Sequence, residues 1–145
     1  MMPPTELTKL ELSRPQLITI LAQLQANYPT EGCGFLSGSC SPWGTGQVQR
    51  LYPITNILFS ATAFLMEPVA MVEALLDMEQ KGETLLAIYH SHPHGAAALS
   101  PTDIAETTYP EAAHLIISLL DWSQPRLRAY LVRGRKAHEI PLEIL

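Results

Sequence analysis

The stretch TLLAIYHSHPHGAAALSPTDIAE, residues 84–106, decides the fold of this chain and carries most of its chemistry. Residues 84–89 form a continuous apolar run, which is long enough for a buried strand and too short for a helix. Ser100-Pro101 then opens a short helix, because serine is a favoured N-cap and proline fits the first helical turn. A buried strand followed by a turn and a helix is typical of an α/β domain.

Helices and strands are predicted on both sides of this stretch. Apolar residues at helical spacing predict a helix over residues 15–27 (Leu17, Ile20, Leu21, Leu24) and a second from Pro68 to Lys81-Gly82 (Val69, Val72, Leu75, Leu76). Shorter runs predict strands over residues 32–39, 47–54, around Phe64, and over 114–120, 126–132 and 137–144. We therefore expect an α/β fold, a single-domain mixed β-sheet flanked by helices, over residues 13–145. Residues 1–12 are expected to be an N-terminal leader whose start, MMPP, is disordered.

Composition excludes several classes of protein. With 145 residues, 47% of them hydrophobic and 16% charged, the chain fits one globular domain. A formal net charge of −5 argues against a nucleic-acid partner, and no apolar run approaches the roughly 20 residues needed to cross a membrane. We expect a soluble, cytoplasmic protein in which Cys33 and Cys40 are free thiols and His94 is an exposed loop residue.

His90 and His92 follow the predicted buried strand directly. Because side chains at i and i+2 of a strand point to the same face, both imidazoles can converge on one ion. Asp103, in the first turn of the next helix, can return to the strand end as a third ligand. Two nitrogens and one carboxylate suit zinc and leave a fourth position for water, as in catalytic zinc sites; Glu31 is the candidate carboxylate for moving the proton of that water.

Each of these residues also has a structural interpretation. A lone histidine is more often a structural residue than a ligand. Ser100-Pro101-Thr102-Asp103 is a good helix start by itself, with a serine cap and an acid in the first turn. Spacing alone therefore leaves the metal site and the helix cap both open.

Two motifs together carry a resemblance to a known family. The pattern His90-Ser91-His92, seven residues, Ser100, two residues, Asp103 resembles the signature of the JAMM metallopeptidases, the catalytic MPN domains. The block EGCGFL, residues 31–36, resembles the Glu-x-Cys-Gly-x-Leu block of the same family. The likeness spans about residues 13–132, and Leu99 departs from the proline that many relatives have there. It implies the cytidine-deaminase-like JAMM/MPN fold of the minimal prokaryotic members.

The resemblance also implies a function and a role for each site residue. His90, His92 and Asp103 would bind Zn²⁺, Glu31 would be the general base and then the acid, and Ser100 would donate a hydrogen bond to the oxyanion. The substrate would be a ubiquitin-like or sulfur-carrier protein, cut after its C-terminal Gly-Gly, and the enzyme could be a homodimer. A non-catalytic MPN binding scaffold and a zinc hydrolase of small-molecule amides are the alternatives.

Overall fold

The computed structural model describes residues 6–145, and its centre is one eight-stranded sheet with the order β7-β6-β5-β4-β2-β3-β1-β8. Pairing is parallel between β4 and β5 and where β1 meets β3 and β8, and antiparallel elsewhere. The predicted mixed sheet is confirmed. Its strands are β1 (Lys9–Leu12), β2 (Cys33–Cys40), β3 (Thr45–Ile54), β4 (Thr84–His92), β5 (Ala113–Ser118), β6 (Arg126–Arg133), β7 (Lys136–Ile140) and β8 (Leu142–Ile144).

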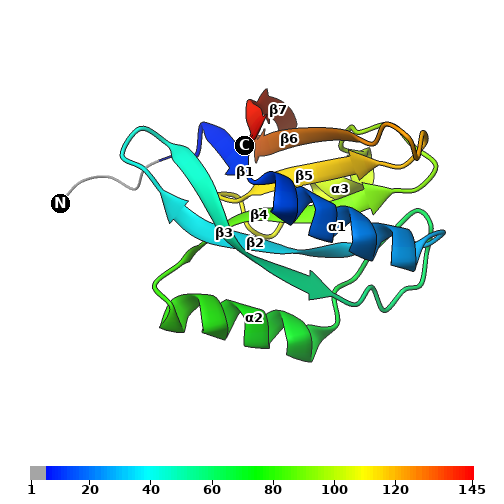
Figure 1. Ribbon diagram of the computed structural model, residues 1–145, viewed down its shortest axis with the longest axis horizontal. Helices are drawn as coiled ribbons and strands as arrows, with labels where there is room; N and C mark the ends of the chain where they lie inside the picture. Colours follow the sequence, from blue (N-terminus) through cyan, green and yellow to red (C-terminus); the bar gives the residue numbers. More distant parts are fainter. Residues whose placement is uncertain (1–5) are drawn as a thin grey trace.

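Helices α1 (Arg14–Asn27) and α2 (Pro68–Gln80) cover opposite faces of the sheet, and the short α3 (Pro101–Ala105) lies on the face away from α1 (Figure 1). Alternate residues of the strands therefore enter two cores. Tyr89 packs in the core beneath α1, whereas its neighbour Ile88 packs in the core beneath α2. His90 lies on the same side as Ile88, because side chains alternate along a strand.

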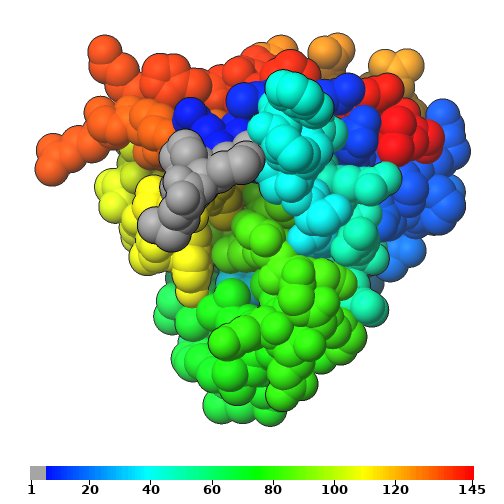
Figure 2. All heavy atoms as spheres, turned by 90° about the vertical axis from the view of Figure 1, so that its left-hand side faces the viewer, coloured from blue at the N-terminus to red at the C-terminus, as the bar shows by residue number. Residues whose placement is uncertain are grey.

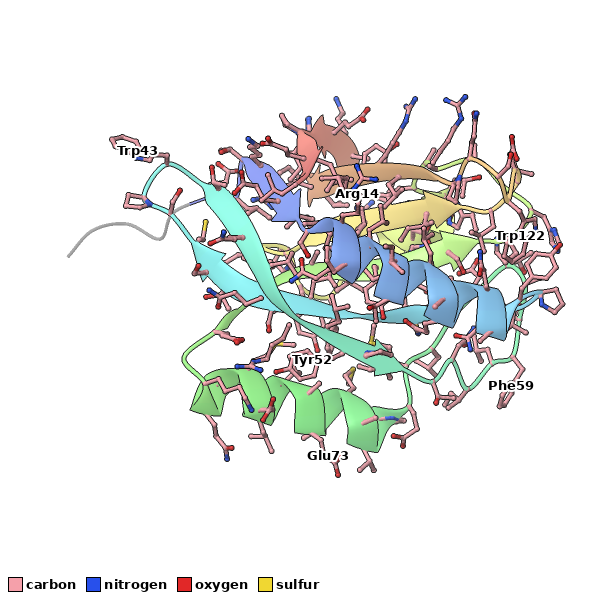
Figure 3. The ribbon with its side chains drawn as sticks, in the orientation of Figure 1. Arg14, Trp43, Tyr52, Phe59, Glu73 and Trp122 are labelled. Carbon is pink, nitrogen blue, oxygen red and sulfur yellow. The ribbon has the colours of Figure 1, made fainter. Side chains whose placement is uncertain are left out.

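Helix α1 matches its prediction, with Ile20 and Leu24 buried, but α2 does not bury the face expected from its apolar spacing. Val69 and Leu76 are 63% and 53% exposed, whereas Ala74 and Met78 face the sheet. The small Ala74 side chain lets the helix approach closely, and Tyr52 of β3 points to α2 and donates to Asp77 at 2.7 Å (Figure 3). Seen from the end that carries the β2–β3 hairpin, α2 forms a ridge at the bottom of the molecule (Figure 2).

Two predicted strands are wrong in detail. Phe64 lies in no strand; residues 57–65 form a loop, and one isolated bridge between Asn56 and Met66 closes it. The loop replaces a strand because the Asn56 side chain takes up three of its backbone groups: it accepts from the Leu58 and Leu65 amides and donates to the Ala63 carbonyl. The predicted strand 137–144 is divided into β7 and β8 at Pro141, which cannot donate to a ladder.

The sheet also includes part of the expected leader. Residues 9–12 form β1, which pairs with β3 and β8 and fully buries Leu10 and Leu12. The expected disorder of MMPP lies outside the described residues. The described fold thus begins before residue 13.

Candidate metal centre

Three side chains from β4 and α3 meet at the carboxyl end of β4. The Nε2 atoms of His90 and His92 are 3.1 Å apart. Nε2 of His90 lies 3.4 Å from Oδ1 of Asp103, and Nε2 of His92 lies 3.3 Å from Oδ2. All three residues offer a ligand atom within 4.8 Å of the others, so the group could hold a metal ion.

The first turn of α3 fixes Asp103 through its helix cap. Ser100 Oγ accepts from the Asp103 amide at 3.0 Å, and the Asp103 carboxylate accepts from the Ser100 amide at 2.9 Å. This reciprocal capping box holds the aspartate rotamer that points at the histidines. The two interpretations that the sequence leaves open therefore coincide, because one carboxylate serves the cap and faces the imidazoles.

The hydrogen bonds of the histidines test whether this group fits a cation. Nδ1 of His92 lies 2.8 Å from the carbonyl oxygen of Ala96, so Nδ1 carries the proton and the Nε2 lone pair faces inward. Metal-bound histidines are oriented in this way, by donating their other N–H to a carbonyl or carboxylate. The lone pairs of two imidazoles and one carboxylate therefore face one another with no positive charge between them. A divalent cation would supply that charge.

Burial and charge set the protonation of these ligands. Burial lowers the pKa of His90, which favours the neutral imidazole that can bind a metal. Burial acts to raise the pKa of Asp103, but the hydrogen bonds of the two histidines, the charge of His90 and the Ser100 amide outweigh it and hold that pKa below its usual range. The trio thus presents one carboxylate with imidazole nitrogens on either side.

Glu31 stands at the start of β2, next to the metal-ligand strand. The Gly32 amide donates to Ser91 Oγ at 2.9 Å and the Ser91 amide donates to the Gly32 carbonyl at 2.9 Å, which ties this segment to β4 between the two histidines. On the other side, Asn56 Nδ2 donates to the Glu31 carbonyl at 3.0 Å. The backbone around Glu31 is therefore held on both sides.

The Glu31 carboxyl is buried and poised to carry a proton. It is 4% exposed, and its Oε1 has no hydrogen-bond partner within residues 6–145. Burial raises its pKa to about 7; the His92 charge opposes this effect and the Asp103 charge adds to it. A carboxyl in this state can take up or release a proton near neutral pH.

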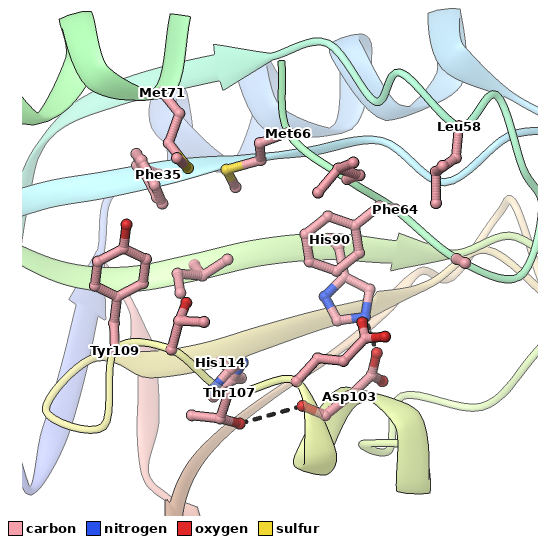
Figure 4. A pocket seen from close by; sticks show the side chains of 15 residues that line it. Phe35, Leu58, Phe64, Met66, Met71, His90, Asp103, Thr107, Tyr109 and His114 are labelled. Atoms are coloured by element: carbon pink, nitrogen blue, oxygen red, sulfur yellow. Dashed lines mark hydrogen bonds and ion pairs between the residues drawn. The ribbon is translucent and has the colours of Figure 1, made fainter. Parts of the chain in front are cut away.

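A cavity of about 560 Å³ adjoins the trio on the α2 side of the sheet. Its walls are mostly apolar, with Phe64, Met66 and Met71 opposite His90 and Asp103 (Figure 4). A smaller hollow of about 230 Å³ borders Glu31 and Asn56. The larger cavity therefore opens on His90 and Asp103, and the smaller one on Glu31.

The structure brings together the residues selected from the sequence. His90, His92 and Asp103 meet, Ser100 caps the helix that holds Asp103, and Glu31 precedes Gly32, which is tied to β4 between the histidines. The sequence analysis did not select two residues that support this group. Ser91 joins Gly32, the neighbour of Glu31, to β4, and the buried His114 lines the 560 Å³ cavity. The only sequence signal for Ser91 is its place between the two histidines. His94 is exposed as predicted, and Cys33 and Cys40 are free, although Cys33 is fully buried.

Comparison with known proteins places this geometry in a family. Residues 13–132 match the family Prok-JAB, described as prokaryotic homologs of the JAB domain. The chain belongs to this family. The JAMM/MPN resemblance is thereby confirmed.

Relatives of this Prok-JAB protein carry peptidase names. A Thermus thermophilus protein named probable TtuB-protein conjugate cleaving protease is 42% identical over 89 residues, 61% of this chain and 56% of that protein. The CysO-cysteine peptidase of Mycobacterium tuberculosis is 29% identical over 126 residues, 87% of this chain and 84% of that protein. The chain therefore spans little more than half of the Thermus protein and most of the mycobacterial one.

Solved structures agree on the fold. The solution structure of a Desulfitobacterium hafniense protein superimposes with a TM-score of 0.85 at 29% identity and covers 94% of this chain and 92% of that one. A JAB1/MPN domain protein of Archaeoglobus fulgidus, at 23% identity, gives a TM-score of 0.59 and covers 96% of this chain and 98% of that one.

Among the described residues, no helix is both long and apolar enough to cross a membrane.

Proposed function

We propose that this protein is a zinc-dependent hydrolase that cuts peptide or isopeptide bonds after the C-terminal Gly-Gly of a ubiquitin-like or sulfur-carrier protein. The observation that carries the proposal is the convergence of His90, His92 and Asp103 beside the buried carboxyl of Glu31. The names of the relatives point to the same chemistry, because one is named for cleaving protein conjugates and another for a CysO-cysteine substrate.

His90, His92 and Asp103 would hold the metal. Two neutral nitrogens and one carboxylate oxygen are ligands that zinc accepts, and three protein ligands are the usual number in catalytic zinc sites. A bound zinc ion supplies Lewis acidity, which polarises a carbonyl group and makes water more acidic. The capping box of α3 and the Ala96 carbonyl orient two of these ligands before any ion arrives.

Glu31 would move the proton. Its carboxylate accepts a proton from the attacking water and returns it to the leaving amine, and a pKa near neutrality suits both steps. Ser100 would stabilise the oxyanion. Its Oγ accepts from the Asp103 amide, and its own hydrogen remains available for donation to substrate.

The preference for Gly-Gly follows from the burial of the site. His90 is 1% exposed and the side chains of His92 and Asp103 are each 13% exposed, so little of the trio can be reached from solvent. Side chains next to the scissile bond would obstruct such a site, whereas two glycines give the backbone close access. Tails of this kind belong to the carriers that the proposal names as substrates.

Two further parts of the proposal concern the protein as a whole. Its free cysteines are usual for proteins of a reducing compartment, which supports a cytoplasmic location. The exposed apolar residues Val69, Val72 and Leu76 of α2 would form the contact of a homodimer. Light scattering of the purified chain, compared with that of Val72→Glu, tests the dimer.

The decisive experiment offers the zinc-loaded protein a sulfur carrier fused through its terminal Gly-Gly to a reporter peptide. We expect cleavage after the second glycine, loss of turnover with retained zinc in Glu31→Gln, and normal turnover in Glu73→Gln, which changes an exposed α2 residue. A protein that holds zinc but cuts only small acyl amides would support the small-molecule alternative. A protein that binds the carrier without zinc or cleavage would support the scaffold alternative.

A further inference from the structure

Two buried imidazole nitrogens lack hydrogen bonds at the rim of the metal centre. Within residues 6–145, His90 Nδ1 and His114 Nε2 are fully covered and have no partner. His114 as a residue is 6% exposed and lines the 560 Å³ cavity together with His90. Buried polar groups in proteins nearly always have a partner, so two unpaired nitrogens in one place require an explanation.

Strand register puts the two rings on the same face of the sheet. In the parallel β4–β5 pair, Ile88 faces His114 and His90 faces Ile116. His114 is therefore the diagonal neighbour of His90. Neighbouring strands lie about 4.8 Å apart, and two positions along a strand span about 6.6 Å. The Cα atoms of His90 and His114 are therefore about 8 Å apart, which two imidazole side chains can span.

The ligand geometry fixes which nitrogen of His90 carries the proton. Its Nε2 faces Asp103 and His92, while its other ring nitrogen lies on the opposite edge of the ring (Figure 4). A histidine that binds a metal through Nε2 keeps its hydrogen on Nδ1 and needs an acceptor for it. His92 has such an acceptor in the Ala96 carbonyl, whereas His90 has none among the described backbone groups.

We propose that His114 is that acceptor: its Nε2 receives the Nδ1–H of His90 through one bridging water molecule. His114 then acts as a positioning residue that fixes the tautomer and ring orientation of His90. A cavity of about 560 Å³ is large enough to hold the linking water, and Phe64, whose ring centroid lies 4.6 Å from that of His90, supports the ring from its face. The inference rests on the proposed metal site and assigns a role to a residue that the proposed mechanism does not use.

Cobalt(II) binding by the full chain tests this role without reference to catalysis. The metal-free protein is titrated with cobalt against a chromogenic chelator, and the visible absorption of the bound ion reports its ligand geometry. His114→Phe keeps a flat ring and removes the acceptor, whereas His114→Gln offers an amide oxygen near the position of Nε2. His138→Phe changes an exposed histidine of β7 and is the matched control.

We expect His114→Phe to weaken cobalt binding by roughly 10- to 100-fold, the usual effect of losing such a partner, and to alter the cobalt spectrum. The melting temperature of its metal-free form should stay close to that of the unaltered protein, because phenylalanine keeps a flat ring in the same place. His114→Gln should restore most of the affinity, and His138→Phe should match the unaltered protein. If His114→Phe does not fold, His114→Leu provides the same comparison.

Two results would overturn the inference while leaving the metal site intact: full cobalt affinity in His114→Phe, or an equal loss in His114→Gln and His114→Phe. The second result would mean that His114 acts through packing alone. Failure of the unaltered protein to bind cobalt would overturn the metal site itself, and this inference with it.

Discussion

Replacing Glu31 by glutamine should stabilise the metal-free protein at high pH. Burial raises the pKa of this carboxyl from 4.5 to about 7. The folded protein therefore binds its proton more tightly than the unfolded chain does, and the free energy of unfolding falls as pH rises between these two values. One pKa unit corresponds to about 1.4 kcal/mol, so the ionised Glu31 destabilises the fold by about 3 kcal/mol above pH 7.

Urea unfolding of chelator-treated protein from pH 4.5 to 8.5 measures this difference. We expect Glu31→Gln to unfold with a free energy about 3 kcal/mol higher than the unaltered protein at pH 8, and the gap should close toward pH 4.5. Glu73→Gln, on the exposed side of α2 (Figure 3), is the control and should follow the unaltered protein throughout. Equal stability of Glu31→Gln and the unaltered protein at pH 8 would refute the buried, unpaired carboxyl on which the proton-transfer role depends.

Three further substitutions test the scaffold. Leu10→Ala should lower the free energy of unfolding by about 2–5 kcal/mol, since β1 fully buries this side chain in the core; an effect below 1 kcal/mol would argue that β1 is not part of the sheet. Gly38→Ala should cost about 1–3 kcal/mol or more in urea unfolding, because the added carbon would stand 1.9 Å from a backbone oxygen of β3. Asn56→Ala should speed hydrogen exchange of the loop amides that it now holds and raise KM, while unchanged exchange would show that the loop holds itself.

The candidate metal centre could be predicted because its three residues are close in sequence. His90 and His92 are two residues apart in one strand, and Asp103 follows in the first turn of the next helix. Strand alternation and helix capping act over a few residues, so both can be recognised within the single stretch 84–106. Local rules were therefore sufficient to select the three side chains that meet.

Interactions between distant segments were not predictable in this way. The Gly32 amide and the Ser91 hydroxyl are 59 positions apart, and only the pairing of β2 with β4 brings them together. The exposed face of α2 was misassigned for a related reason. The spacing of Val69, Val72 and Leu76 fits a buried helix face. In the structure, Ala74 and Met78 pack against the sheet instead.

The link between Gly32 and Ser91 has a consequence for how Prok-JAB domains diversify. Glu31, next to β2, and the two histidines of β4 are held by the pairing of these strands, so the distance between the carboxyl and the imidazoles does not depend on the closure of a lid. Surface loops around the site can then change in length or sequence and admit a different substrate, while the relative positions of these side chains stay the same.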